Sequence, residues 1–107
     1  MIQVHVDISI DPAEENRMLR YFETEFRSAA MKFEGFIEVH MLKLRTAPVG
    51  NAPAGMNYRF ALTYRSEELR QRWVTSDIHQ VVWGTIERSM TSTAYDVLLF
   101  DVATARE

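Results

Sequence analysis

The stretch 2–10, IQVHVDISI, decides the fold, because isoleucine or valine stands at every even position and Gln3, His5, Asp7 and Ser9 lie between them. Alternation with a period of two over this length is typical of a β-strand with one apolar and one polar face. A slip of one residue would bury the polar set, so the aliphatic side must face the core. The polar side is therefore expected on the opposite face of the sheet.

The rest of the chain predicts helices and strands in alternation. A helix is expected over 12–34, since Asp11 can cap it, Pro12 suits its first turn and apolar residues recur at helical spacing. Gly35 should end this helix in a positive-φ conformation. Strands are predicted over 36–45, 58–65 and 95–103, a loop over 46–57, and a second helical segment over 66–89 with a break at 75–77.

This element order predicts an α+β, ferredoxin-like βαββαβ fold in one domain over 1–107. Two helices should cover one face of a four-stranded antiparallel sheet, with the first and third strands as central neighbours. A single domain is also what a length of 107 residues suggests.

Composition excludes several classes of protein. The chain has no cysteine, which excludes disulfides, thiolate metal sites and a cysteine nucleophile. A net charge of −3 gives no basic surface for nucleic acid or an anionic membrane. There is neither a signal-peptide pattern at the N-terminus nor an apolar run long enough to span a membrane, so a cytoplasmic protein is expected.

Apolar residues are more numerous than one layer of helices is expected to cover. The surplus is expected among Tyr58, Phe60, Leu62, Tyr64, Leu98 and Phe100. A solvated sheet face is the simple alternative, since antiparallel sheets tolerate one. A second copy that closes over the open face would instead give a homodimer, with the two sheets forming a barrel.

The segment 73–79, WVTSDIH, carries a recognisable pattern of Trp73, Ser76 and His79. With the element order and the long first helix ending at Gly35, it resembles the antibiotic biosynthesis monooxygenase family over most of the chain. The resemblance implies a dimeric α+β barrel that oxidises an aromatic phenol or quinol with oxygen. It implies no metal and no cofactor, and the chain has no glycine-rich dinucleotide loop.

Such chemistry needs an apolar cavity, a base and a donor or charge that stabilises the substrate anion. His79 is a candidate base or donor, because histidine titrates near neutrality. Trp73 and Trp83 are candidates for stacking on the substrate. Each also has a structural explanation: His79 could pack on the second helix, and the tryptophans could belong to the core.

His5, Asp7 and Arg59 form a second candidate group, because central strands would bring them together on the open face. Asp7 could orient a histidine or accept hydrogen bonds from Arg59, and Arg59 could stabilise an oxyanion. The alternative is a structural hydrogen-bond network. If the group is functional, His5→Ala or Arg59→Ala should weaken binding of an anionic aromatic ligand about tenfold, or roughly 1.4 kcal/mol. His40 is expected at the surface.

Two other functions remain open on the same scaffold. One is a non-catalytic or ligand-binding barrel of the stress-responsive kind. The other is an isomerase or cyclase that uses the His5 and Asp7 pair for proton transfer. The three histidines do not have the spacing of metal ligands. An interior filled by Tyr58, Phe60 and Leu98 would favour the non-catalytic alternative.

Overall fold

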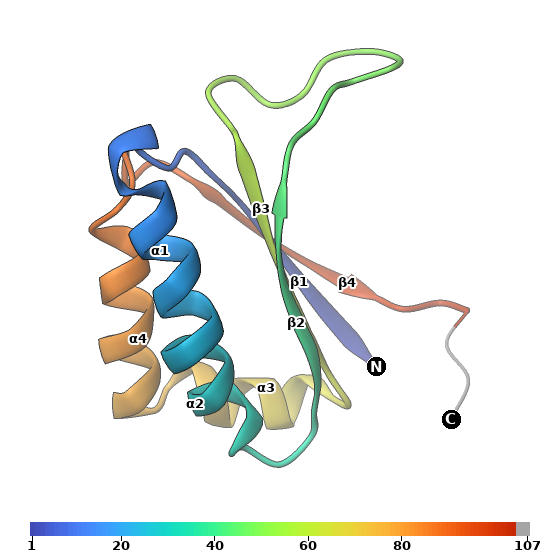
Figure 1. The fold of residues 1–107 in the computed structure, drawn as a ribbon. Helices are drawn as coiled ribbons and strands as arrows, with labels where there is room; N and C mark the ends of the chain where they lie inside the picture. The colour runs from blue at the N-terminus through green and yellow to red at the C-terminus, as the bar shows by residue number, and fades with distance from the viewer. Residues whose placement is uncertain (105–107) are drawn as a thin grey trace.

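The computed structural model describes residues 1–104, so the last three residues of the predicted domain lie outside it. Four antiparallel strands form one sheet in the order β2-β3-β1-β4, and the helices pack on one of its faces (Figure 1). The predicted ferredoxin-like fold and the central β1–β3 pair are confirmed. The elements are β1 Ile2–Ile8, η1 Pro12–Glu14, α1 Glu15–Tyr21, η2 Phe22–Phe26, α2 Arg27–Met31, β2 Phe36–Lys43, β3 Tyr58–Tyr64, α3 Glu67–Val74, α4 Asp77–Glu87 and β4 Asp96–Asp101.

Strand β1 buries its even-numbered residues against the helices, as its alternation predicts. It ends at Ile8 rather than at residue 10, because the backbone ladder with β3 stops at Tyr58. The side chain of Asn57 then takes over: its amide oxygen accepts from Ile10 N at 2.7 Å, and its amide nitrogen donates to Ile10 O at 2.8 Å. Ile10 therefore stays buried beyond the end of the regular strand.

The first helical segment runs from Pro12 to Met31 in four consecutive pieces, of which η1 is a 3₁₀ turn and η2 a π-helical turn. Asp11 caps the segment by accepting from Ala13 N at 2.9 Å. The helix stops three residues before the predicted end at 34. Its last turn tightens through Lys32 N and Phe33 N, which donate to carbonyls only three residues earlier. Gly35 follows with φ +93°, which confirms its predicted conformation.

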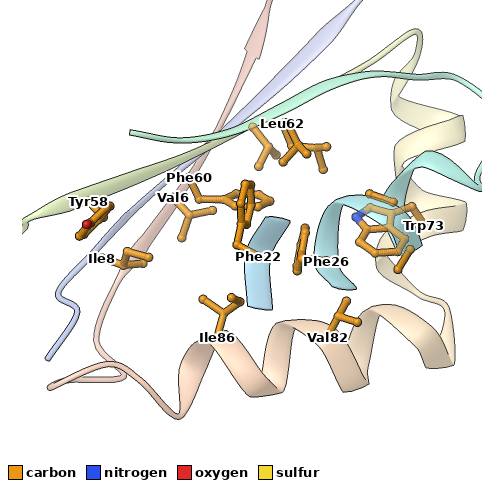
Figure 2. Close-up of a cluster of buried hydrophobic side chains, with 14 of the residues drawn as sticks. Val6, Ile8, Phe22, Phe26, Tyr58, Phe60, Leu62, Trp73, Val82 and Ile86 are labelled. Carbon is orange, nitrogen blue, oxygen red and sulfur yellow. The ribbon is translucent and has the colours of Figure 1, made fainter. Parts of the chain in front are cut away.

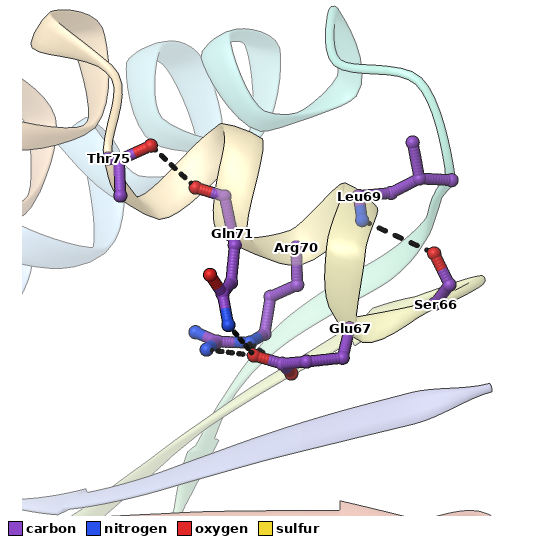
Figure 3. A network of polar contacts seen from close by, with 6 residues as sticks. All are labelled: Ser66, Glu67, Leu69, Arg70, Gln71 and Thr75. Carbon is purple, nitrogen blue, oxygen red and sulfur yellow. Dashed lines mark hydrogen bonds and ion pairs between the residues drawn. The ribbon is translucent and has the colours of Figure 1, made fainter.

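Two serine caps account for the predicted break between α3 and α4. Ser66 Oγ accepts from Leu69 N at 3.2 Å and begins α3 (Figure 3). Ser76 Oγ accepts from His79 N at 3.2 Å and begins α4. Ser76 Oγ also donates to Trp73 O at 2.6 Å. The Trp73, Ser76 and His79 pattern thus encodes the corner between the two helices.

Aromatic side chains from the helices and the sheet form the centre of the core (Figure 2). Phe26 lies edge-on to Phe60 and Trp73, with ring centroids 5.2 Å and 5.7 Å apart. The alternate residues of β3 all belong to this core, namely Tyr58, Phe60, Leu62 and Tyr64. The expected apolar surplus is therefore absent from β3, because this central strand is fully covered by the helices.

Uncovered apolar surface lies instead on β4, which pairs only with β1 and forms one edge of the sheet. All six β4 residues are exposed. Val97, Leu98, Leu99 and Phe100 are each 45–54% exposed, although their side chains alternate between the two faces. The helices thus leave both faces of this edge strand in contact with solvent.

Candidate binding pocket between the helices and the sheet

The sequence-predicted site residues lie on opposite faces of the sheet. His5, Asp7 and Arg59 point to the open face, because their β1 and β3 neighbours Val6 and Phe60 are buried under the helices. His79 and Trp83 lie on α4, on the helix-covered side. The sheet therefore separates the two groups of candidate residues.

A small apolar pocket occupies the helix-covered side. Its volume is about 200 Å³, and it receives side chains from β1, β3, β4, α3, α4 and the segment before β4. Five of its seven residues are apolar or tryptophan, and the other two are a histidine and a tyrosine. The lining residues are Val6, Phe60, Val74, His79, Trp83, Tyr95 and Val97.

His79 is held by the start of α4 and by an aromatic contact. Its backbone N–H donates to Ser76 Oγ, and its ring lies edge-on to Trp73 with centroids 5.0 Å apart. Within residues 1–104, its buried Nδ1 atom has no hydrogen-bond partner. Burial lowers the pKa of His79 below 6.5, the nearby Arg70 lowers it further, and Glu87 opposes the shift. The ring is therefore neutral at pH 7 and keeps one basic nitrogen.

Tyr95 closes a chain of hydrogen bonds along α4. Trp83 Nε1–H donates to the Tyr95 hydroxyl at 3.0 Å, and this hydroxyl donates to Glu87 Oε2 at 2.8 Å. The Trp83 and Tyr95 rings are nearly perpendicular, with centroids 5.9 Å apart. Burial raises the pKa of Tyr95, so the phenol keeps its proton at neutral pH. These bonds fix the two largest polar rings around the pocket.

Trp73 belongs to the core rather than to the pocket lining. It is 1% exposed and lies edge-on to Phe26, Phe33 and His79. This packing is the structural alternative that the sequence left open for Trp73. Trp83, in contrast, lines the pocket directly. An aromatic ring bound in the pocket would contact Trp83, whereas His79 would separate it from Trp73.

The open-face network consists of two separate sets of hydrogen bonds. Arg59 holds Asp7 through two hydrogen bonds, Nε to Oδ1 at 2.7 Å and Nη2 to Oδ2 at 3.2 Å. His5 Nε2 pairs with Gln3 Oε1 at 2.7 Å, and Gln3 Nε2 donates to Thr63 Oγ1 at 3.1 Å. Asp7 therefore accepts from Arg59, one of its two predicted roles.

Burial is the largest cause that lowers the pKa of His5, followed by the charge of Arg59. The His5 ring also contacts the exposed Phe100, with ring centroids 4.9 Å apart. His40 lies on the same face on the edge strand β2, where its side chain is 52% exposed. It therefore lies at the surface of the chain, as expected.

Sequence reasoning missed Tyr95 and Glu87. Glu87 lies two turns beyond His79 on α4, and this spacing was visible in the sequence. No sequence pattern indicated Tyr95, because its contact with α4 depends on the path of the chain between Arg88 and β4. Across residues 1–104, no cluster of three potential metal-ligating side chains is present, and no helix has the length and apolarity needed to cross a membrane.

Comparison with known proteins establishes the fold. No protein-family model and no curated protein matches the chain in sequence. A Caulobacter crescentus structure named as an antibiotic biosynthesis monooxygenase has a TM-score of 0.76 and 14% identity, covering 95% of this chain and 89% of its own. A cofactor-independent oxygenase from Streptomyces nogalater has a TM-score of 0.75 and 10% identity, covering 97% and 94%.

A third structure, Rv0793 from Mycobacterium tuberculosis, has a TM-score of 0.72 and 9% identity, covering 99% of this chain and 98% of its own. The chain thus has the fold of structures named as antibiotic biosynthesis monooxygenases, as the sequence resemblance predicted. Sequence identities this low show a shared fold, and the chemistry has to be argued from the pocket itself.

Proposed function

We propose that the chain binds a small phenol or quinol in the pocket beside α4 and oxidises it with molecular oxygen, without a metal or flavin. The observation that carries the proposal is the neutral, half-buried His79 in the wall of an otherwise apolar pocket. A base in such surroundings can take the proton of a phenol at neutral pH. The cofactor-independent oxygenase with the same fold supports this choice of reaction class.

His79 starts the reaction by accepting one hydroxyl proton of the quinol. The resulting anion gives electrons to oxygen, and a carbon–oxygen bond forms at a ring carbon that carries hydrogen. The hydroperoxide then loses water, which carries away one oxygen atom and two hydrogens. One quinol and one O₂ thus give one hydroxylated quinone and one water. The apolar walls place the ring against Trp83.

The volume of the pocket limits the substrate. At about 200 Å³ it is smaller than typical ligand sites of roughly 300–1,000 Å³. It is larger than an engineered cavity of about 150 Å³ that holds benzene. A single substituted ring therefore fits the pocket, and a polycyclic ligand would have to extend beyond it. The volume therefore restricts the aromatic substrates implied by the sequence resemblance to single-ring compounds.

A homodimer through the open sheet face is part of this proposal. The open face of β4 presents Leu98 and Phe100 beside the network of His5, Asp7 and Arg59. A second copy would cover these apolar side chains and leave the polar ones paired. In this arrangement the open-face network belongs to the dimer interface, while each chain keeps its own pocket.

The isomerase alternative loses its proposed catalytic pair, because His5 bonds to Gln3 and Asp7 bonds to Arg59. The ligand-binding alternative is separated from the oxygenase by experiment. Oxygen consumption is measured with a panel of single-ring phenols and quinols, and binding of the same compounds is measured without oxygen.

We expect water and a hydroxylated quinone in a 1:1 ratio to the oxygen consumed. His79→Ala should lower the rate by at least about 100-fold, as expected for loss of a general base. Gln80→Ala is the matched control, because Gln80 is exposed on α4 next to His79 and does not line the pocket. Binding without oxygen consumption by the wild-type protein would favour a ligand-binding function. Equal rates in the His79→Ala variant and the control would refute the role of His79.

A further inference from the structure

The hydrogen-bond roles of the Tyr95 hydroxyl are fixed by its two partners. The indole N–H of Trp83 can only donate, so Tyr95 must accept from it at 3.0 Å. A carboxylate can only accept, so Tyr95 must donate its single proton to Glu87 at 2.8 Å. A phenolic oxygen has one proton and two lone pairs. One lone pair is therefore all that Tyr95 has left to offer a ligand.

The same count applies to the other polar groups of the pocket wall. The N–H of Trp83 is used by Tyr95, and the remaining lining residues apart from His79 carry aliphatic or phenyl side chains. His79 is reserved for the reacting hydroxyl under the proposed function. The Tyr95 end of the pocket thus presents an acceptor without a free donor.

We infer that Tyr95, held by Glu87, makes the pocket select a ring that bears a hydroxyl over the same ring bearing a carbonyl. This inference rests on the proposed pocket and deepens it by naming the group that the ligand must present. A hydroxyl donates to the free lone pair of Tyr95. A carbonyl offers only lone pairs, so its oxygen would be buried against another acceptor without a hydrogen bond.

Glu87 makes this selection rigid. To donate to a carbonyl, the Tyr95 hydroxyl would have to turn away from a carboxylate, and hydrogen bonds to charged groups are the stronger class. Burial raises the pKa of Tyr95, which keeps the proton on the phenol. Glu87 is thus a positioning residue that acts on the ligand through Tyr95.

The selection also gives the reaction a direction. A quinol presents its second hydroxyl to Tyr95 while the first faces His79. Oxidation converts that second hydroxyl to a carbonyl, and the hydrogen bond to Tyr95 is lost. The oxidised product therefore binds more weakly than the quinol, and the pocket is cleared after turnover.

The test compares three single-ring ligands by anaerobic NMR titration: hydroquinone, 4-methoxyphenol and 4-hydroxyacetophenone. Each ligand keeps one hydroxyl for His79, and the three differ only in the group that faces Tyr95. The wild-type protein should bind hydroquinone at least about tenfold more tightly than 4-methoxyphenol or 4-hydroxyacetophenone, because these have no donor left for Tyr95. Tyr95→Phe should bring the three affinities within about twofold of one another, since the acceptor is removed. Far-UV circular dichroism checks that each variant is folded.

Glu87→Gln is the decisive variant, because a glutamine amide can donate to Tyr95 and free its hydroxyl proton. The preference for hydroquinone over 4-hydroxyacetophenone should fall by at least about fivefold or reverse. Glu68→Gln is the matched control, since Glu68 is exposed on α3 and pairs with Arg72. It should leave the preference unchanged.

A wild-type preference below about twofold would overturn the inference, as would an unchanged preference in folded Glu87→Gln protein. If none of the three ligands binds at concentrations up to its solubility limit, both the proposed ligand site and the inference are refuted. Selective binding of hydroquinone without oxygen consumption by any quinol would instead uphold the inference and refute the oxygenase chemistry.

Discussion

Replacing Gly35 with alanine should destabilise the fold far more than the same change at Gly50. Both glycines have positive φ, +93° and +75°, in a region that side-chain-bearing residues rarely adopt. A Cβ at Gly50 would have no atom within 4 Å, whereas one at Gly35 would lie 2.9 Å from Leu69 Cβ and 2.5 Å from Leu69 Cδ1. The pair thus separates backbone strain from steric overlap.

The magnitude follows from these two effects. Left-handed backbone costs a residue with a Cβ roughly 1–2 kcal/mol, and this is all that Gly50→Ala should lose. Overpacking adds roughly 1–3 kcal/mol at Gly35, giving about 2–5 kcal/mol in total. Rotation of the Leu69 side chain can move Cδ1 away. It cannot move Leu69 Cβ, which is fixed to the backbone of α3.

Urea unfolding of the wild type, the two alanine variants and Gly35→Ala/Leu69→Ala provides the test. We expect the double variant to recover only part of the loss, because alanine at 69 retains the Cβ atom at 2.9 Å. Equal free energies of unfolding for Gly35→Ala and Gly50→Ala would refute the overlap between the end of the first helix and α3. A changed m-value would show that the variants also alter the unfolded state.

Three further predictions concern the histidines, the open face and the assembly. The free energy of unfolding should fall as the pH drops below 6.5, because burial lowers the pKa of folded His79 and His5 and the unfolded chain then binds more protons. Urea titrations at pH 5–7 should show a smaller fall for His79→Gln. His5→Ala and Arg59→Ala are expected from the sequence to weaken the binding of an anionic aromatic ligand about tenfold, which NMR titration with benzoate checks. Unchanged affinity would confine ligand binding to the pocket beside α4. Light scattering at micromolar concentration should give the mass of a dimer whose interface buries more than roughly 1,000 Å², and a monomer would leave the open face without its proposed cover.

Most of the fold could be predicted from local sequence patterns. The alternation over 2–10 determined which side of β1 meets the helices, and Ser66 and Ser76 marked the starts of α3 and α4. The positive φ of Gly35 was also predicted, although the helix itself ends earlier, at Met31. Each of these features depends on neighbours close in sequence, so residue order alone was sufficient.

The pocket depends on contacts between distant segments, so most of its lining residues could not be predicted from the sequence. His79 and Trp83 were named as candidates from the sequence, but their side of the sheet follows from how α4 packs. The hydrogen bond between Tyr95 and Glu87 joins the segment before β4 to the last turn of α4. Neither periodicity nor a capping rule predicts such a contact. The sequence also predicted uncovered apolar residues on β3, but the helices bury them. How much of a sheet the helices bury depends on tertiary packing, which a local pattern does not specify.

The exposed edge of the sheet affects how the protein behaves in concentrated solution. Strand β4 carries four consecutive large apolar residues between Asp96 and Asp101. Among residues 1–104, no strand pairs with the backbone groups along its outer edge. Short uncharged strands of this kind add readily to other strands and seed fibrils. The flanking carboxylates oppose such stacking by charge repulsion. Neutral Asp96→Asn and Asp101→Asn variants should therefore precipitate sooner, even if their melting temperatures are unchanged.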